Sequence, residues 1–169
     1  EIEGEYYSQL DIMSSVRRNL GLATQHKIKN KHSIGLSDML MDVRNTYNEP
    51  LTEAHLKHWH RLLMGSFPAI QAGAWRTDEA PMQIVSGSVA QPKVHYEAPP
   101  SIRVPKEMEQ FIAWFNECNI TAAPVKAAVA HLYFEAIHPF EDGNGRIGRA
   151  IVEKALSQGL QCPLPFSVS

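Results

Sequence analysis

The sequence has few cysteines, no large excess of either charge and no long hydrophobic run. Its two cysteines, Cys118 and Cys162, are too few for a disulfide framework, which favours a reducing compartment such as the cytoplasm. The 16 lysines and arginines nearly balance the 18 aspartates and glutamates, so a net charge of -2 gives no electrostatic reason to expect binding to nucleic acid or to a membrane surface. No run approaches the roughly 18 apolar residues that a membrane span needs, and no signal peptide opens the chain.

The composition is that of a globular domain. Hydrophobic residues make up 44% and charged residues 20% of the 169 positions, which excludes a disordered or collagen-like chain. This length suits one hydrophobic core, so residues 1–169 are expected to form a single domain. Because the chain starts at Glu1 without a methionine, we expect it to be a fragment of a longer protein.

Apolar residues at helical spacing predict helices in two parts of the chain, residues 1–64 and 106–169. The first part holds two stripes: Leu36, Met39, Leu40 and Val43, with Ser37 as a candidate N-cap, and Leu51, Leu56, Trp59, Leu62 and Leu63, with Thr52 and Glu53 as start signals. The second part holds three: Met108, Phe111, Ile112 and Phe115; Val125, Ala128, Val129, Leu132 and Ala136; and Ile147, Ala150, Ile151 and Ala155. These stripes predict an all-α fold, and the apolar faces of the early helices leave a homodimer open.

The middle of the chain, residues 65–105, is rich in proline. Its six prolines exclude long helices there. Within it, Gln83-Ile84-Val85-Ser86 and Lys93-Val94-His95-Tyr96 flank a turn that contains Gly, Ser and Pro, which predicts a β-hairpin. A segment this long with little core-forming sequence is expected to be either a functional flap or disordered.

Twelve residues, 138–149, concentrate groups that can carry chemistry. They read His-Pro-Phe-Glu-Asp-Gly-Asn-Gly-Arg-Ile-Gly-Arg. Pro139 disfavours the α conformation at the residue before it, so the preceding helix should end near Ile137 and leave His138 placed to take a proton near neutral pH. Gly143-Asn144-Gly145 can turn backbone N–H groups inward as an anion nest, and the start of the next helix adds more unpaired N–H groups.

Arg146 and Arg149 lie where that next helix should begin. Helix N-termini favour acidic side chains, so two arginines there break a local rule, which indicates a functional site. A polyanion would compensate, because arginine grips phosphate oxygens in a fork. Asp142 would repel a bare phosphate but can hold Mg²⁺ against one. The segment thus predicts phosphoryl or nucleotidyl transfer to a hydroxyl, with an ordinary helix–turn–helix connection as the structural alternative.

Three other groups of polar residues have simpler interpretations. His55 and His58 share a helical face with His60 nearby, but no third metal ligand occurs at suitable spacing, so a solvated helix face is preferred over a metal pair. His131 lies two turns before His138 and is expected to be a hydrogen-bonded polar group beneath the site. A basic patch lacks interleaved aromatics and favours a solvated surface over nucleic-acid binding; its members are His26, Lys27, Lys29, Lys31 and His32.

Residues 138–149 resemble the signature motif of Fic-domain proteins, His-Pro-Phe-x-Asp-Gly-Asn-Gly-Arg-x-x-Arg, with every fixed position present. Three upstream stretches resemble the flap region of bacterial members of that family: Gly73-Ala74-Trp75-Arg76, Ile84-Val85-Ser86-Gly87 and Val94-His95-Tyr96-Glu97-Ala98-Pro99-Pro100. The resemblance implies a Fic-type helical bundle with an inserted hairpin flap. It also implies transfer of AMP from ATP to a Ser, Thr or Tyr hydroxyl of a target protein, which would pair with the flap as a strand.

The resemblance implies a role for each motif residue. His138 would deprotonate the target hydroxyl for attack on the α-phosphate, and Asp142 would coordinate Mg²⁺ that bridges the phosphates. Phe140 would bury its ring and anchor the loop. Relatives that phosphorylate carry Lys at the position of Gly145, so the glycine favours AMP transfer.

The same resemblance places the phosphate groups of ATP. The Gly143 and Gly145 amides, together with Asn144, would hold the α- and β-phosphates and stabilise the charge that develops there. Arg146 would contact the β-phosphate side, and Arg149 the γ-phosphate.

Many Fic proteins also carry an inhibitory Ser/Thr-x-x-x-Glu-Gly/Asn motif whose Glu pairs with the second motif arginine. Glu3-Gly4 fits the end of that motif, which would pair Glu3 with Arg149 and displace the γ-phosphate. The alternative is an ordinary charge within the acidic cluster of Glu1, Glu3 and Glu5.

Three functions follow from the sequence. The leading one is a protein adenylyltransferase held in check by Glu3. The same site could instead remove AMP from a modified protein or transfer another nucleotide or phosphate group. A non-catalytic helical module that binds an anion or a protein is the third, and the intact His138 and Asp142 argue against it, because a pure binder needs neither a base nor a metal carboxylate.

Overall fold

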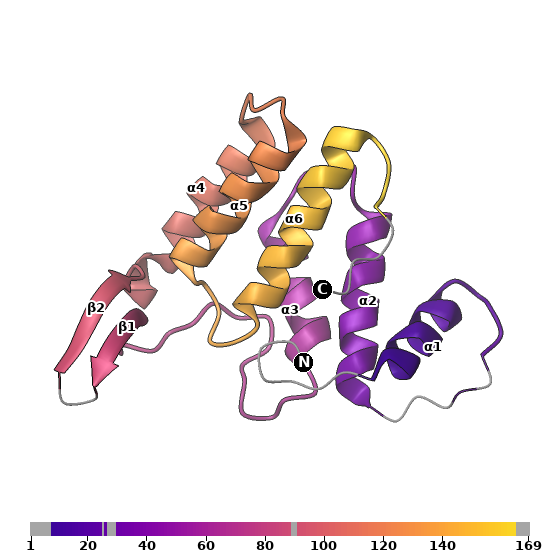
Figure 1. Cartoon of the computed structure of the whole chain (residues 1–169), viewed down its shortest axis with the longest axis horizontal. Coiled ribbons are helices and arrows are strands. Elements are labelled where there is room, and N and C mark those ends of the chain that lie inside the picture. Colours follow the sequence, from indigo (N-terminus) through magenta and orange to yellow (C-terminus); the bar gives the residue numbers. More distant parts are fainter. Residues whose placement is uncertain (1–7, 25, 27–29, 89–90, 165–169) are drawn as a thin grey trace.

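The computed structural model describes residues 8–24, 26, 30–88 and 91–164. Its elements follow in the order α1 (Gln9–Asn19), α2 (Lys31–Asn45), α3 (Glu53–Met64), β1 (Gln83–Ser88), β2 (Gln91–Glu97), the 3-10 helix η1 (Ser101–Arg103), α4 (Val104–Glu117), α5 (Ala123–Ile137) and α6 (Asn144–Leu160). The all-α fold with one inserted hairpin is thus confirmed (Figure 1). Within the described ranges, no helix is both long and apolar enough to cross a membrane.

The core forms where α5 and α2 pack against α6, with α3 behind α6 (Figure 1). Four of the five predicted stripes supply it, because their large side chains are buried together. Fully buried members include Trp59, Leu56, Met108, Phe111, Phe115, Ile147 and Ile151. Each such side chain contributes roughly 1.5–3 kcal/mol by leaving water.

The fifth stripe, on α5, does not face the core. Val125 is 52% exposed and Leu132 is 71% exposed, whereas the opposite side of the helix is buried through Ala127, Ala130 and Phe134. Alanines let α6 approach α5 closely, and the helix is apolar nearly all round. Periodicity therefore predicts the helix but selects the wrong face for burial.

The start of α2 also differs from the sequence prediction. Asn30 is the N-cap, because its side chain accepts a hydrogen bond from the His32 N–H at 2.8 Å. Ser37 lies inside the helix, where its hydroxyl donates to the Ser33 carbonyl at 2.7 Å. By contrast, Thr52 caps α3 as predicted and accepts from the His55 N–H.

The hairpin projects beyond the C-terminal end of α5 (Figure 1). Its strands pair antiparallel, with Ile84 opposite Tyr96 and an irregularity between Ile84 and Val85. The Tyr96 hydroxyl donates to the Ala136 carbonyl at 2.7 Å, and the Ala98 N–H donates to the Met82 carbonyl at 2.9 Å. These bonds fix the base of the hairpin beside the end of α5.

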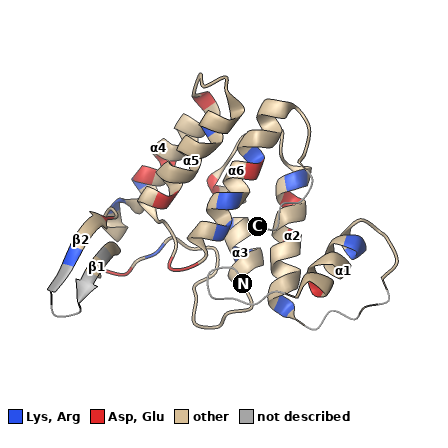
Figure 2. Cartoon of the chain, in the orientation of Figure 1, with Lys and Arg blue, Asp and Glu red and all other residues tan. Residues whose placement is uncertain are grey.

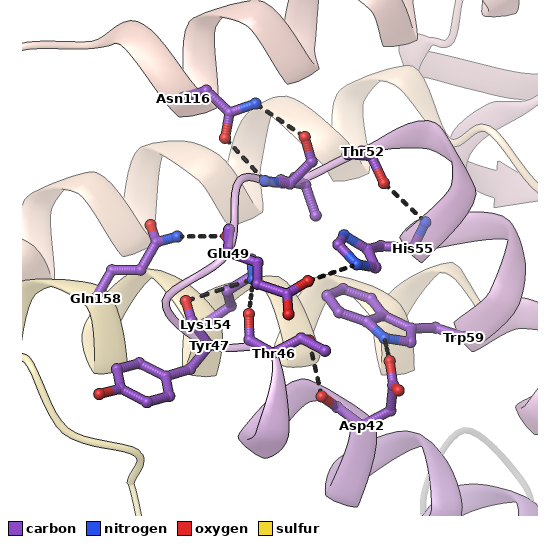
Figure 3. Close-up of polar contacts among 11 residues, drawn as sticks. Asp42, Thr46, Tyr47, Glu49, Thr52, His55, Trp59, Asn116, Lys154 and Gln158 are labelled. Atoms are coloured by element: carbon purple, nitrogen blue, oxygen red, sulfur yellow. Dashed lines mark hydrogen bonds and ion pairs between the residues drawn. The ribbon is translucent and has the colours of Figure 1, made fainter.

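A buried lysine on α6 holds the connection between α2 and α3 (Figure 3). The Lys154 ammonium donates to the carbonyls of Thr46, at 2.5 Å, and Tyr47, at 3.4 Å. Burial lowers its pKa to about 8, an effect that the carboxylates of Glu49 and Asp42 partly offset. The connection is thereby tied to the helix that begins at the predicted site.

Two amide side chains hold the rest of that connection (Figure 3). Asn116 of α4 accepts from the Leu51 N–H at 2.9 Å and donates to the Leu51 carbonyl at 2.8 Å. Gln158 of α6 donates to the Glu49 carbonyl at 3.2 Å. Side chains from two different helices thus satisfy backbone groups that have no partner in a helix or strand.

We predict that Lys154→Met destabilises the fold, because it leaves the Thr46 and Tyr47 carbonyls without their donor. The expected loss is about 1–3 kcal/mol in the free energy of unfolding, measured by urea denaturation. Lys106→Met, at an exposed position of α4, is the matched control and should leave the midpoint unchanged. Equal midpoints for the two variants would contradict the prediction.

Candidate active site

The candidate site begins where α5 ends. The last residue of the helix is Ile137, as predicted, and His138 adopts a left-handed conformation with φ 50° and ψ 60°. The His138 N–H still donates to the Phe134 carbonyl at 3.0 Å. Pro139 thus excludes His138 from the right-handed helical region, and the histidine side chain is left 37% exposed at the helix end.

A pair of hydrogen bonds closes the loop that follows. The Asn144 side chain accepts from the Phe140 N–H and donates to the Phe140 carbonyl, both at 2.9 Å, and both residues are buried. Phe140 therefore anchors the loop, as expected from the sequence. Both polar atoms of the Asn144 amide bind Phe140, and the Asn144 backbone N–H lies in the first turn of α6.

Gly143 completes the turn into α6. Its φ of 79° lies in the left-handed region that favours glycine. A Cβ there would lie 3.2 Å from side-chain atoms of both Leu63 and Met64 on α3, so these two side chains would have to shift slightly to admit it. Helix α6 then begins at Asn144, and the N–H groups of its first turn have no acceptor within the helix. These are the N–H groups at which the sequence predicts an anion site, and that site stays a prediction.

His60 of α3 forms the floor beneath this loop. Its ring stacks on Phe140 with centroids 4.0 Å apart. Nδ1 accepts from the Gly73 N–H at 2.7 Å, so Nε2 carries the proton and donates to the Asp142 carbonyl at 3.2 Å. Burial lowers the pKa of His60 to about 4, so the ring is neutral at pH 7.

The position of His60 corrects the sequence interpretation. The three histidines of α3 were assigned to a solvated face, but His60 is fully buried. A signal was present, because His60 lies four residues after Leu56 and three before Leu63 and so shares their apolar face. Among the described residues no cluster of three or more potential metal ligands occurs, so the pair His55 and His58 gains no third ligand there.

The charged motif residues gather on the loop and the first two turns of α6. Figure 2 shows an acidic loop followed directly by basic segments on this helix. Asp142 has a 52% exposed side chain, and its Oδ1 accepts from the Gly143 N–H at 2.5 Å and from Arg146 at 3.3 Å. The Arg146 guanidinium is buried, whereas Arg149, one turn further, is half-buried. Mg²⁺ is commonly held by one or two carboxylates plus substrate phosphates, so the exposed Asp142 fits that ion.

Two residues of α5 lie beside the catalytic candidate. Glu135 Oε2 is 3.7 Å from His138 Nδ1. A Cβ on Gly148 would lie 2.5 Å from Glu135 Oε1 and 3.1 Å from the His131 ring, so a side chain here would displace the Glu135 carboxylate. His131 lies beneath the site as expected. However, its buried Nδ1 has no hydrogen-bond partner among the described residues, so the prediction of a satisfied group is wrong for this atom.

A small pocket opens between the hairpin and α5. It has a volume of about 200 Å³. Its polar lining residues are Gln83, Glu135 and His138, and its apolar lining comes from the hairpin and the residues next to it: Met82, Ile84, Tyr96 and Ala98. Glu3, Lys27 and Lys29 lie outside the described residues.

A model of the Fic/DOC family matches residues 50–156, which is more than half of the chain. The chain is 34% identical over 61 residues to a probable protein adenylyltransferase of Aquifex aeolicus, covering 36% of this chain and 19% of that protein. It is 30% identical over 95 residues to the protein adenylyltransferase fic-1 of Caenorhabditis elegans, covering 55% of this chain and 16% of that protein.

Solved structures give the same picture of the fold. A Fic family protein from Desulfovibrio desulfuricans superposes with a TM-score of 0.60 at 27% identity, over 89% of this chain and 43% of that one. A Fic-domain-containing signalling protein from Bacteroides thetaiotaomicron gives 0.64 at 23% identity, over 92% and 58%. The chain thus spans less than a fifth of the two curated relatives and about half of the two solved chains.

We predict that His60 makes the stability of the fold pH-dependent. The unfolded chain binds a proton at this residue below a pKa of about 6.5, whereas the folded protein does so only near 4. Stability supplied by neutral His60 is therefore complete above pH 6.5 and is lost as the pH falls from 6.5 toward 4. Urea denaturation of the wild type and His60→Gln at several pH values measures this, because glutamine does not titrate. Parallel pH profiles for the two proteins would refute the prediction.

Proposed function

Since the chain belongs to the Fic/DOC family, we propose that it is a protein adenylyltransferase that moves AMP from ATP to a Ser, Thr or Tyr hydroxyl of a target protein. One observation carries the proposal. The Asn144–Phe140 closure gathers the partly exposed His138, the exposed Asp142 and the first-turn N–H groups of α6 at a single loop. A base, a metal carboxylate and an anion site are the groups that nucleotidyl transfer to a hydroxyl requires.

His138 acts as the general base. Glu135 faces Nδ1, so we assign Nε2 as the atom that takes the proton from the target hydroxyl. The hydroxyl oxygen then forms a bond to the α-phosphorus, while the bond from that phosphorus to the bridging oxygen of the β-phosphate breaks. Pyrophosphate leaves with that bond's electron pair, and AMP stays on the target.

The phosphates bind at the start of α6. The backbone N–H groups of Asn144, Gly145 and Arg146 point out of the helix end and stabilise charge that develops on the phosphates. Arg149, one turn further, is assigned to the γ-phosphate. Asp142 would hold Mg²⁺, which supplies positive charge to neutralise the phosphate oxygens.

The target binds along the flap. A two-stranded hairpin has outer edges that can pair with one more extended segment, and such pairing positions a backbone with little demand on its sequence. The pocket beside His138 supports this assignment, because residues of the hairpin and the proposed base line it together.

We predict that His138→Ala abolishes AMP transfer. Incubation with α-labelled ATP and Mg²⁺, alone and with a protein lysate, measures label on protein. Removal of a general base typically costs about 10²- to 10⁴-fold, so label should fall by at least about a hundredfold. His58→Ala on α3 is the matched control and should keep its label. Label that survives in His138→Ala, or that comes from γ-labelled ATP alone, would contradict AMP transfer by this base.

We further propose that Glu3 inhibits the enzyme by pairing with Arg149 and displacing the γ-phosphate. The proposal rests on the sequence Glu3-Gly4 and on the arginine's place near the start of α6. Glu3→Gly is then expected to raise auto-AMPylation above that of the wild type, measured with α-labelled ATP and Mg²⁺. Glu5→Gly, in the same acidic cluster, is the control and should not. Equal activity of the wild type and Glu3→Gly would refute inhibition by this residue.

A further inference from the structure

The Arg76 side chain binds backbone carbonyls at the C-terminal end of α5. The residue is only 6% exposed. Nε donates to the His138 carbonyl at 2.7 Å, and Nη2 donates to the carbonyls of Pro99, at 2.5 Å, and Ile137, at 3.3 Å. The Arg76 N–H also donates to the Pro139 carbonyl at 2.9 Å. Arg76 therefore binds the carbonyls of three successive residues at the proposed general base and a fourth carbonyl, that of Pro99, where the flap ends.

These contacts satisfy carbonyls that the left-handed turn would otherwise leave unpaired. The final carbonyls of a helix lack intrahelical donors and carry its negative dipole end, so a cation is favourable there. Arginine fits because its planar fork reaches several acceptors in fixed directions, whereas a lysine ammonium is a single point charge.

The arrangement is costly as well as favourable. Burial lowers the pKa of Arg76, and among the described residues no carboxylate forms an ion pair with it. A charge placed in the interior with only backbone partners loses much hydration. Packing alone already holds α5 in place through Phe134 and Ile137, which are buried in the core. The charged side chain therefore calls for an explanation beyond the stability of the helix.

We propose that Arg76 is a positioning residue for AMP transfer, which sets the backbone of His138 and fixes its distance from the flap. The Arg76 guanidinium binds both the His138 carbonyl and the carbonyl of Pro99, which follows β2. The distance between His138 and a target strand bound to the flap is therefore set by one side chain. The inference rests on the proposed function for its catalytic consequence, while the positioning itself depends on Arg76 alone.

The test compares Arg76→Lys and Arg76→Ala in a Glu3→Gly background. Arg103→Lys and Arg103→Ala are the matched controls, because Arg103 is exposed next to the flap and pairs with Glu107. Thermal unfolding, equilibrium binding of ATP and single-turnover transfer from α-labelled ATP are measured for each. For Arg76→Lys we expect a folded protein that binds ATP within about twofold of the parent and transfers AMP at least about tenfold more slowly, since small misplacements of reacting groups cost up to about a hundredfold.

Chemical rescue separates positioning from simple loss of structure. Millimolar guanidinium should restore part of the transfer rate of Arg76→Ala and leave that of Arg103→Ala unchanged. An unchanged rate in Arg76→Lys, or a rate loss matched by an equal loss of ATP binding, would overturn the proposal. So would the absence of rescue by guanidinium in an Arg76→Ala variant that remains folded.

A measurement that needs no activity keeps this inference distinct from the proposed function. Amide hydrogen exchange at His138 reports its bond to the Phe134 carbonyl and should be faster in Arg76→Lys than in Arg103→Lys. If the parent protein transfers no AMP, the proposed function fails, yet this exchange still tests the positioning role. Unchanged exchange at His138 would refute that role whatever the activity.

Discussion

A single reversal of the main chain, at residues 138–143 between α5 and α6, is the constraint on which the rest of the structure depends. The reversal requires a positive φ at both of its ends, His138 and Gly143. For a non-glycine residue the left-handed conformation costs roughly 1–2 kcal/mol, so the turn persists only because other groups hold it. The Asn144 amide holds it from inside, His60 supports it from α3, and the guanidinium of Arg76 holds it from the flap side.

The electrostatics of the loop follow from the same reversal. Asp142 and Arg146 lie one turn apart and pair, so the unfavourable arginine near a helix start is partly offset within the motif itself. The carboxylate nevertheless stays half-exposed, while the arginine is buried. The outward side of the loop therefore presents a carboxylate and backbone N–H groups, while His60 beneath the loop is kept uncharged by burial. This polarity suits a ligand that brings both a metal and phosphate oxygens.

Local chemistry explains which parts of this arrangement the sequence predicts. Proline ends α5 at Ile137 and glycine opens α6, whatever packs around them, so the loop was predictable from its own residues. The hairpin was also predictable from its own residues, because two β-prone stretches flank a turn. The supporting residues were not, because Arg76 lies 62 residues from the carbonyl of His138, and only the folded chain brings them together. The prediction of the buried face of α5 was wrong for another reason. This helix is apolar nearly all round, so its sequence pattern has no polar face that marks the solvent side.

The contacts between α2 and α6 bear on where the chain can be cut. Sequence similarity marks residues 50–156, but the Lys154 ammonium inside that stretch finds its acceptors at Thr46 and Tyr47, before it begins. The Trp59 indole likewise donates to Asp42 on α2, at 2.7 Å. A fragment trimmed to the matched stretch would lose these acceptors together with the helix that packs on α3 and α6. The cooperatively folded unit is therefore longer than the stretch that the family model matches, and it includes α2 because α3 and α6 depend on these contacts.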